Sequence, residues 1–296
     1  MKRNMLVLRL KVAAILPLDF ACSGPITHSG EKLTTGKSHR KKPNRFSLND
    51  DMDVEKVLWF NVTWNIRGLG EKEEKLDKIL NENNIKISVI AESKKKLQGT
   101  KETEHYTVIT VELSDTPEAS KELCYGIHKS ISNKIDHYKF WNDGVIETRL
   151  KTQRGHLTIL GVYAPTEGRD ELNEEFHETL QKILYKVNKN DYIMLIGDMN
   201  ARFGDNRVAN IVGTNGEGTL NNSGRKLIDF CTFNNLKIMN TFFKRKEIHK
   251  FTGETRGHKS IIDYFITYVK TSKVIQDFRV YRSNEIDSDH YYYLQK

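Results

Sequence analysis

Cysteine is scarce in this 296-residue chain, which contains Cys22, Cys124 and Cys231. Their number is odd and their spacings are unrelated, so the sequence shows neither a disulfide framework nor the paired spacing of a zinc site. This excludes small disulfide-stapled folds and favours a reducing compartment. The fold must therefore depend on apolar packing, and a hydrophobic fraction of 38% suffices for a globular core.

Long apolar runs are also lacking. No segment reaches the roughly 18 to 20 apolar residues that a membrane-spanning helix needs. Residues 5–18 are fairly apolar, but Arg9 and Lys11 interrupt them and no clear cleavage pattern follows. A signal peptide and an organelle presequence stay open as alternatives, while we favour a disordered basic extension. The run His39-Arg40-Lys41-Lys42 is a weak nuclear localisation signal, so we expect a nuclear or cytoplasmic protein without membrane contact.

Outside the N-terminal extension, the chain also has almost no excess of basic over acidic residues. Ten of the 47 Lys/Arg and three of the 39 Asp/Glu lie in residues 1–50, which gives this segment a net charge of +7. The other 246 residues have a net charge of +1. Net charge is therefore a weak argument for nucleic-acid binding by the folded part.

The sequence divides into an extension and one folded domain. Residues 20–50 are rich in Ser, Thr, Gly, Lys and Pro without apolar periodicity, which is typical of disorder. We therefore predict a basic, disordered extension over residues 1–53 and a folded domain over residues 54–296.

Many short strands and a few helices are predicted in the folded domain. Apolar residues spaced three to four apart predict helices over 71–84, 170–187 and 224–234, and we expect Ser223 to cap the last one. Short apolar segments predict strands over 57–64, 85–91, 105–111, 123–128, 144–150, 157–163, 192–196, 236–239, 261–267 and 277–281, with a hairpin turn at Gln153-Arg154-Gly155. This composition fits two packed sheets flanked by helices.

The most informative segment is DYIMLIGDMN, residues 191–200. Its apolar part has the length of a strand buried on both faces, and we expect Gly197 to let the backbone turn after it. Asp198 and Asn200 then place a carboxylate and a carboxamide at the end of the strand. Such a pair can hold a water molecule and steady a phosphate, but the same sequence also forms an ordinary Asx-turn.

Other polar residues stand at or near the ends of predicted strands in the same way. Individually, each has a structural explanation, such as a turn cap, a core tyrosine with a bonded hydroxyl, or a buried acid. Their occurrence together in one order favours a shared site. The residues are Asn65, Glu92, Tyr163, Asp198 with Asn200, Asp263, and Asp289 with His290.

Four motifs give the chain a resemblance to a known family: Trp64-Asn65-Ile66-Arg67-Gly68, Gly161-Val162-Tyr163-Ala164-Pro165-Thr166, Gly197-Asp198-Met199-Asn200-Ala201-Arg202-Phe203-Gly204 and Asn221-Asn222-Ser223-Gly224. The chain resembles the endonuclease/exonuclease/phosphatase superfamily, which includes DNase I-like nucleases. Within it, the chain looks most like the craniofacial development protein 2-like set and LINE retrotransposon endonuclease domains. The resemblance implies an α/β fold, a four-layer α/β-sandwich with two mainly antiparallel sheets packed face to face and flanked by helices. It also implies hydrolysis of phosphodiester bonds with Mg²⁺, or alternatively Mn²⁺, and DNA as the partner.

The resemblance implies roles for the acidic positions and the histidine. Glu92 resembles the principal magnesium ligand, and Asp289 a second acid near the metal. Asp198 resembles the acid that orients or activates the attacking water. His290 resembles the imidazole beside the scissile phosphate, and Asp263 the carboxylate that orients it.

The amide and phenol positions match residues that bind the substrate. Asn65 and Asn200 resemble the amides that hold the phosphate or a metal-bound water, and Tyr163 the phenol that contacts the phosphate. Whether Asp198 or His290 acts as the general base stays open.

The sequence also departs from the family pattern. Arg67 stands where many AP endonucleases have an Asp, which argues against a dedicated abasic-site repair enzyme. Thr166 stands where repair enzymes often have Asn, and Phe251-Thr252 where relatives often have an aromatic residue such as Trp. Residues 291–294 leave room for only a short last strand, so we expect the final strand pairing and the final helix to be incomplete.

Three hypotheses remain. The favoured one is a Mg²⁺-dependent endonuclease of retroelement origin that nicks DNA. The alternatives are a phosphatase of the same superfamily, and a catalytically inactive, truncated or domesticated domain with a binding role. The sequence indicates no protein partner, and we expect a monomer.

Overall fold

The computed structural model describes residues 61–66, 68–93, 99–110, 123–142, 144–153, 155–204, 207–255, 257–275, 277–281, 288 and 291–295. The chain divides into two units, Met1–Phe46 and Ser47–Lys296, and every described residue lies in the second. The predicted extension over residues 1–53 and the start of the domain lie outside the described residues, so both stay predictions.

The described strands are β1 Asn61–Asn65, β2 Ile87–Ala91, β3 Gly99–Glu102, β4 Tyr106–Thr110, β5 Leu123–His128, β6 Ile135–Asn142, β7 Val145–Thr152, β8 Gly155–Tyr163, β9 Tyr192–Asp198, β10 Leu236–Ile238, β11 Gly253–Thr255, β12 His258–Ser260, β13 Asp263–Tyr268, β14 Phe278–Tyr281 and β15 Tyr292–Gln295. The α-helices are α2 Glu73–Glu82, α3 Asp170–Leu184 and α4 Asn222–Phe233, and the short 3-10 helices are η1 Gly70–Lys72, η2 Lys129–Lys134, η3 Met239–Phe242, η4 Glu247–His249 and η5 Thr271–Val274. Among the described residues, no helix has the length and apolar character that crossing a membrane requires.

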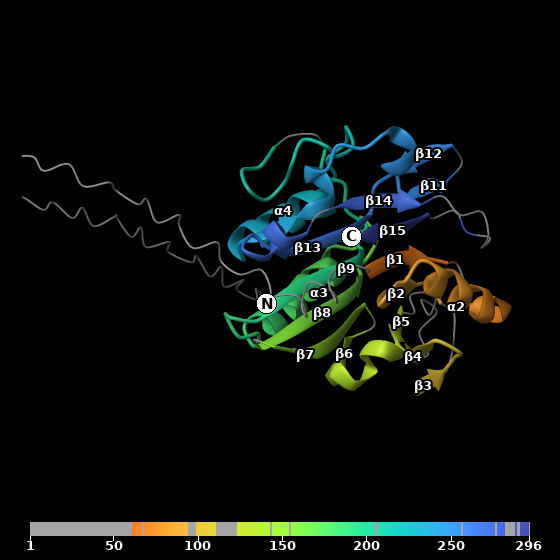
Figure 1. Ribbon diagram of the computed structural model, residues 1–296. Helices are drawn as coiled ribbons and strands as arrows, with labels where there is room; N and C mark the ends of the chain where they lie inside the picture. The colour runs from red at the N-terminus through yellow and green to blue at the C-terminus, as the bar shows by residue number, and fades with distance from the viewer. Residues whose placement is uncertain are drawn as a thin grey trace, which may run out of the picture. The chain divides into compact units, whose positions relative to one another are not determined.

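Two large sheets organise the described part of the chain (Figure 1). The first contains β14-β15-β1-β2-β5-β4-β3 in this order, and the second β10-β13-β9-β8-β7-β6. Most neighbouring strands are antiparallel, but β1 and β2 are parallel, as are β8 and β9. The parallel pairs matter for the site because they bring the carboxyl ends of two strands to one edge.

A buried apolar cluster lies between the two sheets. It includes Val89 from β2 and Tyr125 from β5 in the first sheet, and Ile159 from β8 and Ile196 from β9 in the second. All four are fully buried, as expected of side chains that point inward from two packed sheets. The sheets are therefore packed face to face.

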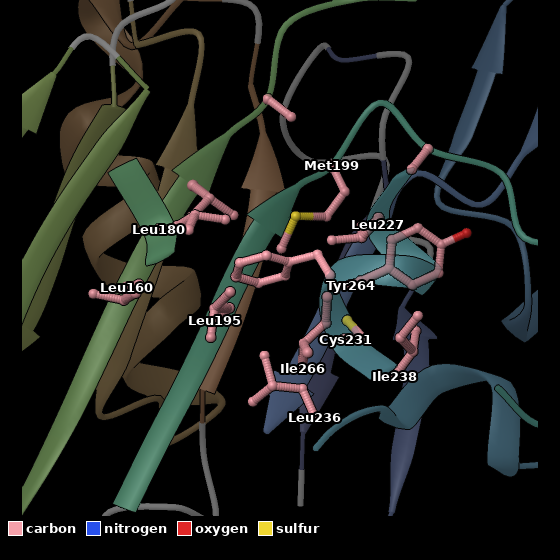
Figure 2. Packing of buried hydrophobic residues seen from close by; sticks show 14 of the residues in the cluster. Leu160, Leu180, Leu195, Met199, Leu227, Cys231, Leu236, Ile238, Tyr264 and Ile266 are labelled. Atoms are coloured by element: carbon pink, nitrogen blue, oxygen red, sulfur yellow. The ribbon is translucent and has the colours of Figure 1, made fainter. Parts of the chain in front are cut away.

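Helices cover the outer face of each sheet. Leu76, Ile79 and Leu80 recur at helical spacing in α2 and are buried with residues of β1 and β2. On the second sheet, α3 and α4 pack over β8, β9 and β13, and Figure 2 shows Leu195 of β9 and Leu227 of α4 in this cluster. The order helix, sheet, sheet, helix confirms the predicted four-layer α/β-sandwich.

Two predictions about element ends are wrong. Helix α4 begins at Asn222, and its N-cap is Asn221, whose side chain accepts a hydrogen bond from the Gly224 N–H, in place of the predicted cap Ser223. Strand β9 does not end in a turn at Gly197 but continues through it to Asp198. Both errors have the same cause. The residue that caps a helix and the residue that ends a strand depend on which backbone groups the tertiary structure offers as hydrogen-bond partners.

The expectation of an incomplete last pairing is also wrong. Strand β15 pairs antiparallel with β1 on one side and with β14 on the other, as Figure 1 shows. The four residues of β15 are enough to form hydrogen bonds along both of its edges, with β1 on one side and β14 on the other.

Candidate functional site

Three of the predicted polar residues lie in one row across the second sheet. Tyr163 ends β8, Asp198 ends β9 and Asp263 begins β13. Asp198 is directly opposite Tyr163 on the parallel side and opposite Asp263 on the antiparallel side. Asp198 and Asp263 are only 2% and 1% exposed. Burying carboxylates is costly unless neighbouring groups compensate, so such a row is typical of a functional site.

Two further predicted residues come from the first sheet. Asn65 ends β1 and Glu92 directly follows β2, and the parallel pairing of these strands brings both to the same edge. The Asn65 Nδ2 donates a hydrogen bond of 2.7 Å to the Glu92 Oε1. The Tyr163 hydroxyl donates to the same oxygen over 3.2 Å. A carboxylate of one sheet is thus held by a phenol of the other, which joins the two sets of strand ends into one site.

The Glu92 backbone adopts a left-handed conformation, with φ of +53°. This region is unfavourable for a residue with a side chain longer than Asn. Its carbonyl accepts a hydrogen bond of 2.7 Å from the Gly68 N–H, which holds the turn after β2 against the segment after β1. Both side-chain hydrogen bonds described for Glu92 end on Oε1, so among the described residues Oε2 has none.

Asp198 and Asn200 form an Asx-turn, and the same turn places the Asn200 side chain at the strand ends that make up the candidate site. The Asn200 N–H donates to the Asp198 Oδ1 over 2.9 Å, which closes the turn. Its Nδ2 donates to the Ala164 carbonyl over 2.7 Å, in the loop after β8. Asn200 also has a positive φ of +44°, and the two bonds fix its side chain beside the end of β8.

The Tyr163 phenol is held in its protonated form. Burial raises the pKa of this phenol far above its usual value, and the neighbouring charges of Asp198 and Glu92 raise it further. A hydrogen bond from Asn200 acts in the opposite direction but does not cancel these effects. Tyr163 therefore acts as a hydrogen-bond donor at neutral pH.

Arg67, Asp289 and His290 lie outside the described residues, so the roles of Asp289 and His290 stay predictions. The residues on either side of the last two are described. The Ser288 hydroxyl donates to the Asn65 carbonyl over 2.6 Å, and the Tyr291 N–H donates to a loop carbonyl over 2.8 Å. Residues 288 and 291 are thus attached to the same edge of the sandwich as Asn65.

Thr252 is a residue at the site that sequence reasoning did not assign. It is fully buried, and its carbonyl is the acceptor for the Tyr291 N–H. Its hydroxyl accepts from the Ile262 N–H over 3.2 Å and from the Asp263 N–H over 3.4 Å. The signal in the sequence was the departure from the family pattern at Phe251-Thr252.

The donor set around Glu92 fits a hard divalent cation. It consists of carboxylate, amide and phenol oxygens, which Mg²⁺ prefers over nitrogen or sulfur. A different group, Asp77, Glu104 and His105, brings three side chains of ligand type together among the described residues. There, the His105 Nδ1 and the Asp77 Oδ2 are 2.5 Å apart and the His105 N–H also bonds to Asp77, so these contacts fasten α2 to the loop after β3. None of the predicted metal ligands belongs to that group.

The chain is similar in sequence to known proteins. The family model for endonuclease-reverse transcriptase matches residues 157–294. Craniofacial development protein 2 from Bos taurus and from Tragulus javanicus are each 30% identical over 235 residues, which is 77% of this chain. The chain spans about two fifths of the length of these relatives, 39% and 40%.

Solved structures share the fold at low sequence identity. The endonuclease domain of TRAS1, a telomere-specific non-LTR retrotransposon, is 14% identical with a TM-score of 0.56, over 80% of this chain and 96% of that one. The catalytic domain of Xenopus laevis APE2 is 15% identical with a TM-score of 0.61, over 80% and 91%. The AP endonuclease LMAP from Leishmania major is 12% identical with a TM-score of 0.61, over 80% and 86%.

The fold, the family model and the relatives confirm the resemblance of this chain to a class of protein, the endonuclease/exonuclease/phosphatase superfamily. Members of this class are nucleases and phosphodiesterases. Within the class, the chain is similar to craniofacial development protein 2.

Proposed function

We propose that this chain is a metal-dependent phosphodiester hydrolase that nicks DNA and is of retroelement origin. The observation that carries the proposal is the meeting of Asn65, Glu92 and Tyr163, from both sheets, on one carboxylate oxygen at the strand ends. The buried Asp198 is directly opposite Tyr163 at the same edge. Fixed amide and phenol donors beside carboxylates are the groups that a phosphodiester transition state requires. The solved structures that share the fold include an endonuclease domain and an AP endonuclease, which supports the same chemistry.

Glu92 and Asp289 would hold the cation, Mg²⁺ or alternatively Mn²⁺. When bound, it would neutralise charge on the phosphate and stabilise the leaving oxygen. The hydrogen bonds from Asn65 and Tyr163 hold the Glu92 carboxylate in place.

The remaining residues would activate water and hold the phosphate. Asp198 would orient or deprotonate the attacking water, while His290 would act on the scissile phosphate and Asp263 would orient the His290 ring. Asn200 and Asn65 would donate N–H hydrogen bonds to phosphate oxygens. The Tyr163 hydroxyl has a single hydrogen, which goes to the Glu92 Oε1 in this structure, so it would turn from Glu92 to donate to the phosphate. The raised pKa of Tyr163 suits this role, because a protonated phenol can donate and does not repel the phosphate.

The proposal is tested by nicking of supercoiled plasmid in Mg²⁺ and in Mn²⁺. We expect the wild-type chain to convert plasmid to the nicked form, with DNA as its partner and the protein a monomer. Asp198→Asn keeps the acceptor for the Asn200 N–H but removes the charge, so the fold should survive. Loss of acid–base assistance should slow nicking by about 10²–10⁴-fold for Asp198→Asn and for His290→Ala.

The matched control is Glu178→Ala. Glu178 is an exposed carboxylate on α3 that pairs with Lys182 over 3.4 Å, and its removal should leave nicking unchanged. Calorimetry adds a reading that does not depend on turnover, because Glu92→Gln should weaken Mg²⁺ binding while Glu178→Ala does not. A wild-type chain that nicks no DNA in either metal, or variants that nick equally well, would refute the proposal. Release of phosphate from nucleotide or lipid phosphates in place of nicking would favour the phosphatase alternative.

A further inference from the structure

The Asn221-Asn222-Ser223-Gly224 motif has a structural role that its resemblance to relatives does not explain. Asn221 precedes α4, and its Oδ1 accepts two backbone hydrogen bonds. One comes from the Gly224 N–H over 2.8 Å and closes the first turn of the helix. The other comes from the Arg202 N–H over 2.9 Å, in the loop that follows β9. A single side-chain oxygen thus caps a helix and holds the segment that contains Asn200.

The amide nitrogen of Asn221 is also used twice. Its Nδ2 donates to the Glu167 Oε2 over 3.2 Å and to the Asn200 carbonyl over 3.5 Å. The Asn221 N–H donates to the Arg202 carbonyl over 3.2 Å. This one residue therefore contacts the backbone of residues 200–202 and the loop after β8.

These bonds complete a closed ring around Asn200. The Asn200 side chain donates to the Ala164 carbonyl, at the start of the loop that also contains Glu167. Glu167 accepts from Asn221, and Asn221 donates back to the Asn200 carbonyl. Asn200 itself has φ of +44°, a conformation that needs support from its surroundings.

The packing of α4 is consistent with this attachment. A Cβ on Gly224 would lie 2.0 Å from the Arg202 carbonyl oxygen, so the start of the helix directly contacts the loop after β9. The helix N-terminus is therefore packed directly against the segment that contains Asn200.

We propose that Asn221 is a positioning residue for Asn200, which it holds in the orientation that contacts the phosphate. The inference rests on the proposed function of Asn200 but adds a residue outside the strand-end set. Without the hydrogen bonds of the Asn221 side chain, the Asn200 side chain would shift relative to the substrate. A displacement of about 1 Å from a remote substitution can cost on the order of 10²-fold in rate.

Two substitutions at position 221 and one beside it separate positioning from helix capping. Asn221→Ala removes all four side-chain hydrogen bonds. Asn221→Asp keeps the two that Oδ1 accepts, so the cap is retained, but it loses both donors and places a carboxylate beside Glu167. Asn222→Ala is the control, because the exposed Asn222 side chain donates over 3.4 Å to the exposed Asp170.

The test compares plasmid nicking and backbone hydrogen exchange in the full-length chain. For Asn221→Ala we expect kcat to fall about 10–100-fold with KM within about threefold of wild type. Asn221→Asp should keep the wild-type melting temperature but not the wild-type kcat, and Asn222→Ala should match wild type in both. Exchange over residues 199–204 should accelerate in Asn221→Ala, where the Arg202 N–H loses its acceptor, and not in Asn222→Ala.

Three results would overturn the inference: wild-type kcat in Asn221→Ala, equal reductions of kcat in Asn221→Ala and Asn222→Ala, or full kcat in Asn221→Asp, which would show that the donor bonds to Glu167 and to the Asn200 carbonyl do not position Asn200. If the wild-type chain does not nick DNA, the proposed function fails, whereas the exchange measurement still decides positioning. Unchanged exchange over residues 199–204 in Asn221→Ala would then refute the role of Asn221.

Discussion

At the scale of single residues, Glu92 has a strained backbone conformation at the candidate site. Among the described residues other than glycine, positive φ occurs at Asn84, Glu92, Asn200, Asn210 and Asn235. Asparagine tolerates this conformation, but glutamate does not, and the cost at Glu92 is about 1–2 kcal/mol. The bonds from Asn65, Tyr163 and Gly68 hold the residue there. Strain held in this way is typical of functional positions.

A half-buried histidine outside the site gives a prediction for pH dependence. The His177 Nδ1 lies 2.7 Å from the Asn173 carbonyl, while its Nε2 is buried without a partner among the described residues. Burial lowers the pKa of His177 below its usual 6.5. Because the pKa in the folded chain is below that in the unfolded chain, the unfolded chain takes up the proton first as the pH falls. The stability contributed by the neutral ring is fully present above about pH 6.5 and is lost as the pH falls from there towards the folded-state pKa.

We therefore expect His177→Gln to lose less unfolding free energy than wild type between pH 7 and pH 5. Urea unfolding at both pH values measures this difference. His137→Gln, at an exposed position on β6, serves as the control and should follow wild type. Parallel losses in wild type and His177→Gln would contradict the prediction.

At the scale of elements, the close parallel approach of β8 and β9 sets the position of Asp198. Gly197 pairs with Val162 across these strands and has φ of +149°. A Cβ at this position would lie 1.9 Å from the Val162 carbonyl oxygen. The glycine is therefore required by the contact between the two strands rather than by a turn.

Gly197→Ala should destabilise the fold by about 2–4 kcal/mol, because the added methyl group meets backbone that has no room to move. Chemical denaturation measures this loss. Gly218→Ala is the matched control, since a Cβ there has open space within 4 Å. Equal stability of the two variants would show that β8 and β9 are not so closely apposed.

Not every element could be predicted from the sequence. The strands at 123–128 and 157–163 were predicted because they are continuous apolar segments, and the structure confirms both as β5 and β8. Strand β6 was missed because Ile135–Asn142 is mostly exposed at the edge of its sheet and has no apolar alternation. An edge strand is specified by its partner, here β7, more than by its own composition.

At the scale of the whole described fold, the candidate site depends on the packing of the two sheets. Asn65 and Glu92 come from one sheet, while Tyr163 and Asp198 come from the other. The hydrogen bond from Tyr163 to Glu92 crosses between them. Either sheet alone would supply only two of these four side chains.

The charge distribution along the chain gives a prediction at this scale. The folded part has a net charge of +1, so most sequence-independent attraction to DNA should come from residues 1–50, with +7. Deleting residues 1–50 should weaken binding to duplex DNA and flatten the plot of log K against log[NaCl]. A variant of full length with the ten Lys/Arg of this segment changed to Gln should behave like the deletion. An unchanged slope in both would rule out this role for the extension.

The sequence by itself determined which residues were candidates for the site. They stand at or near the ends of predicted strands, where a polar side chain is costly to bury unless a site uses it. The sequence also determined the class of fold, since the apolar periods of 2 and 3.6 are local properties. Only the tertiary structure decided that Asn65 and Tyr163 share one oxygen of Glu92, and that Asn221 rather than Ser223 caps α4 and holds the Asn200 segment. The physical reason is that hydrogen-bond partners separated by many residues are chosen by packing, which no local pattern encodes.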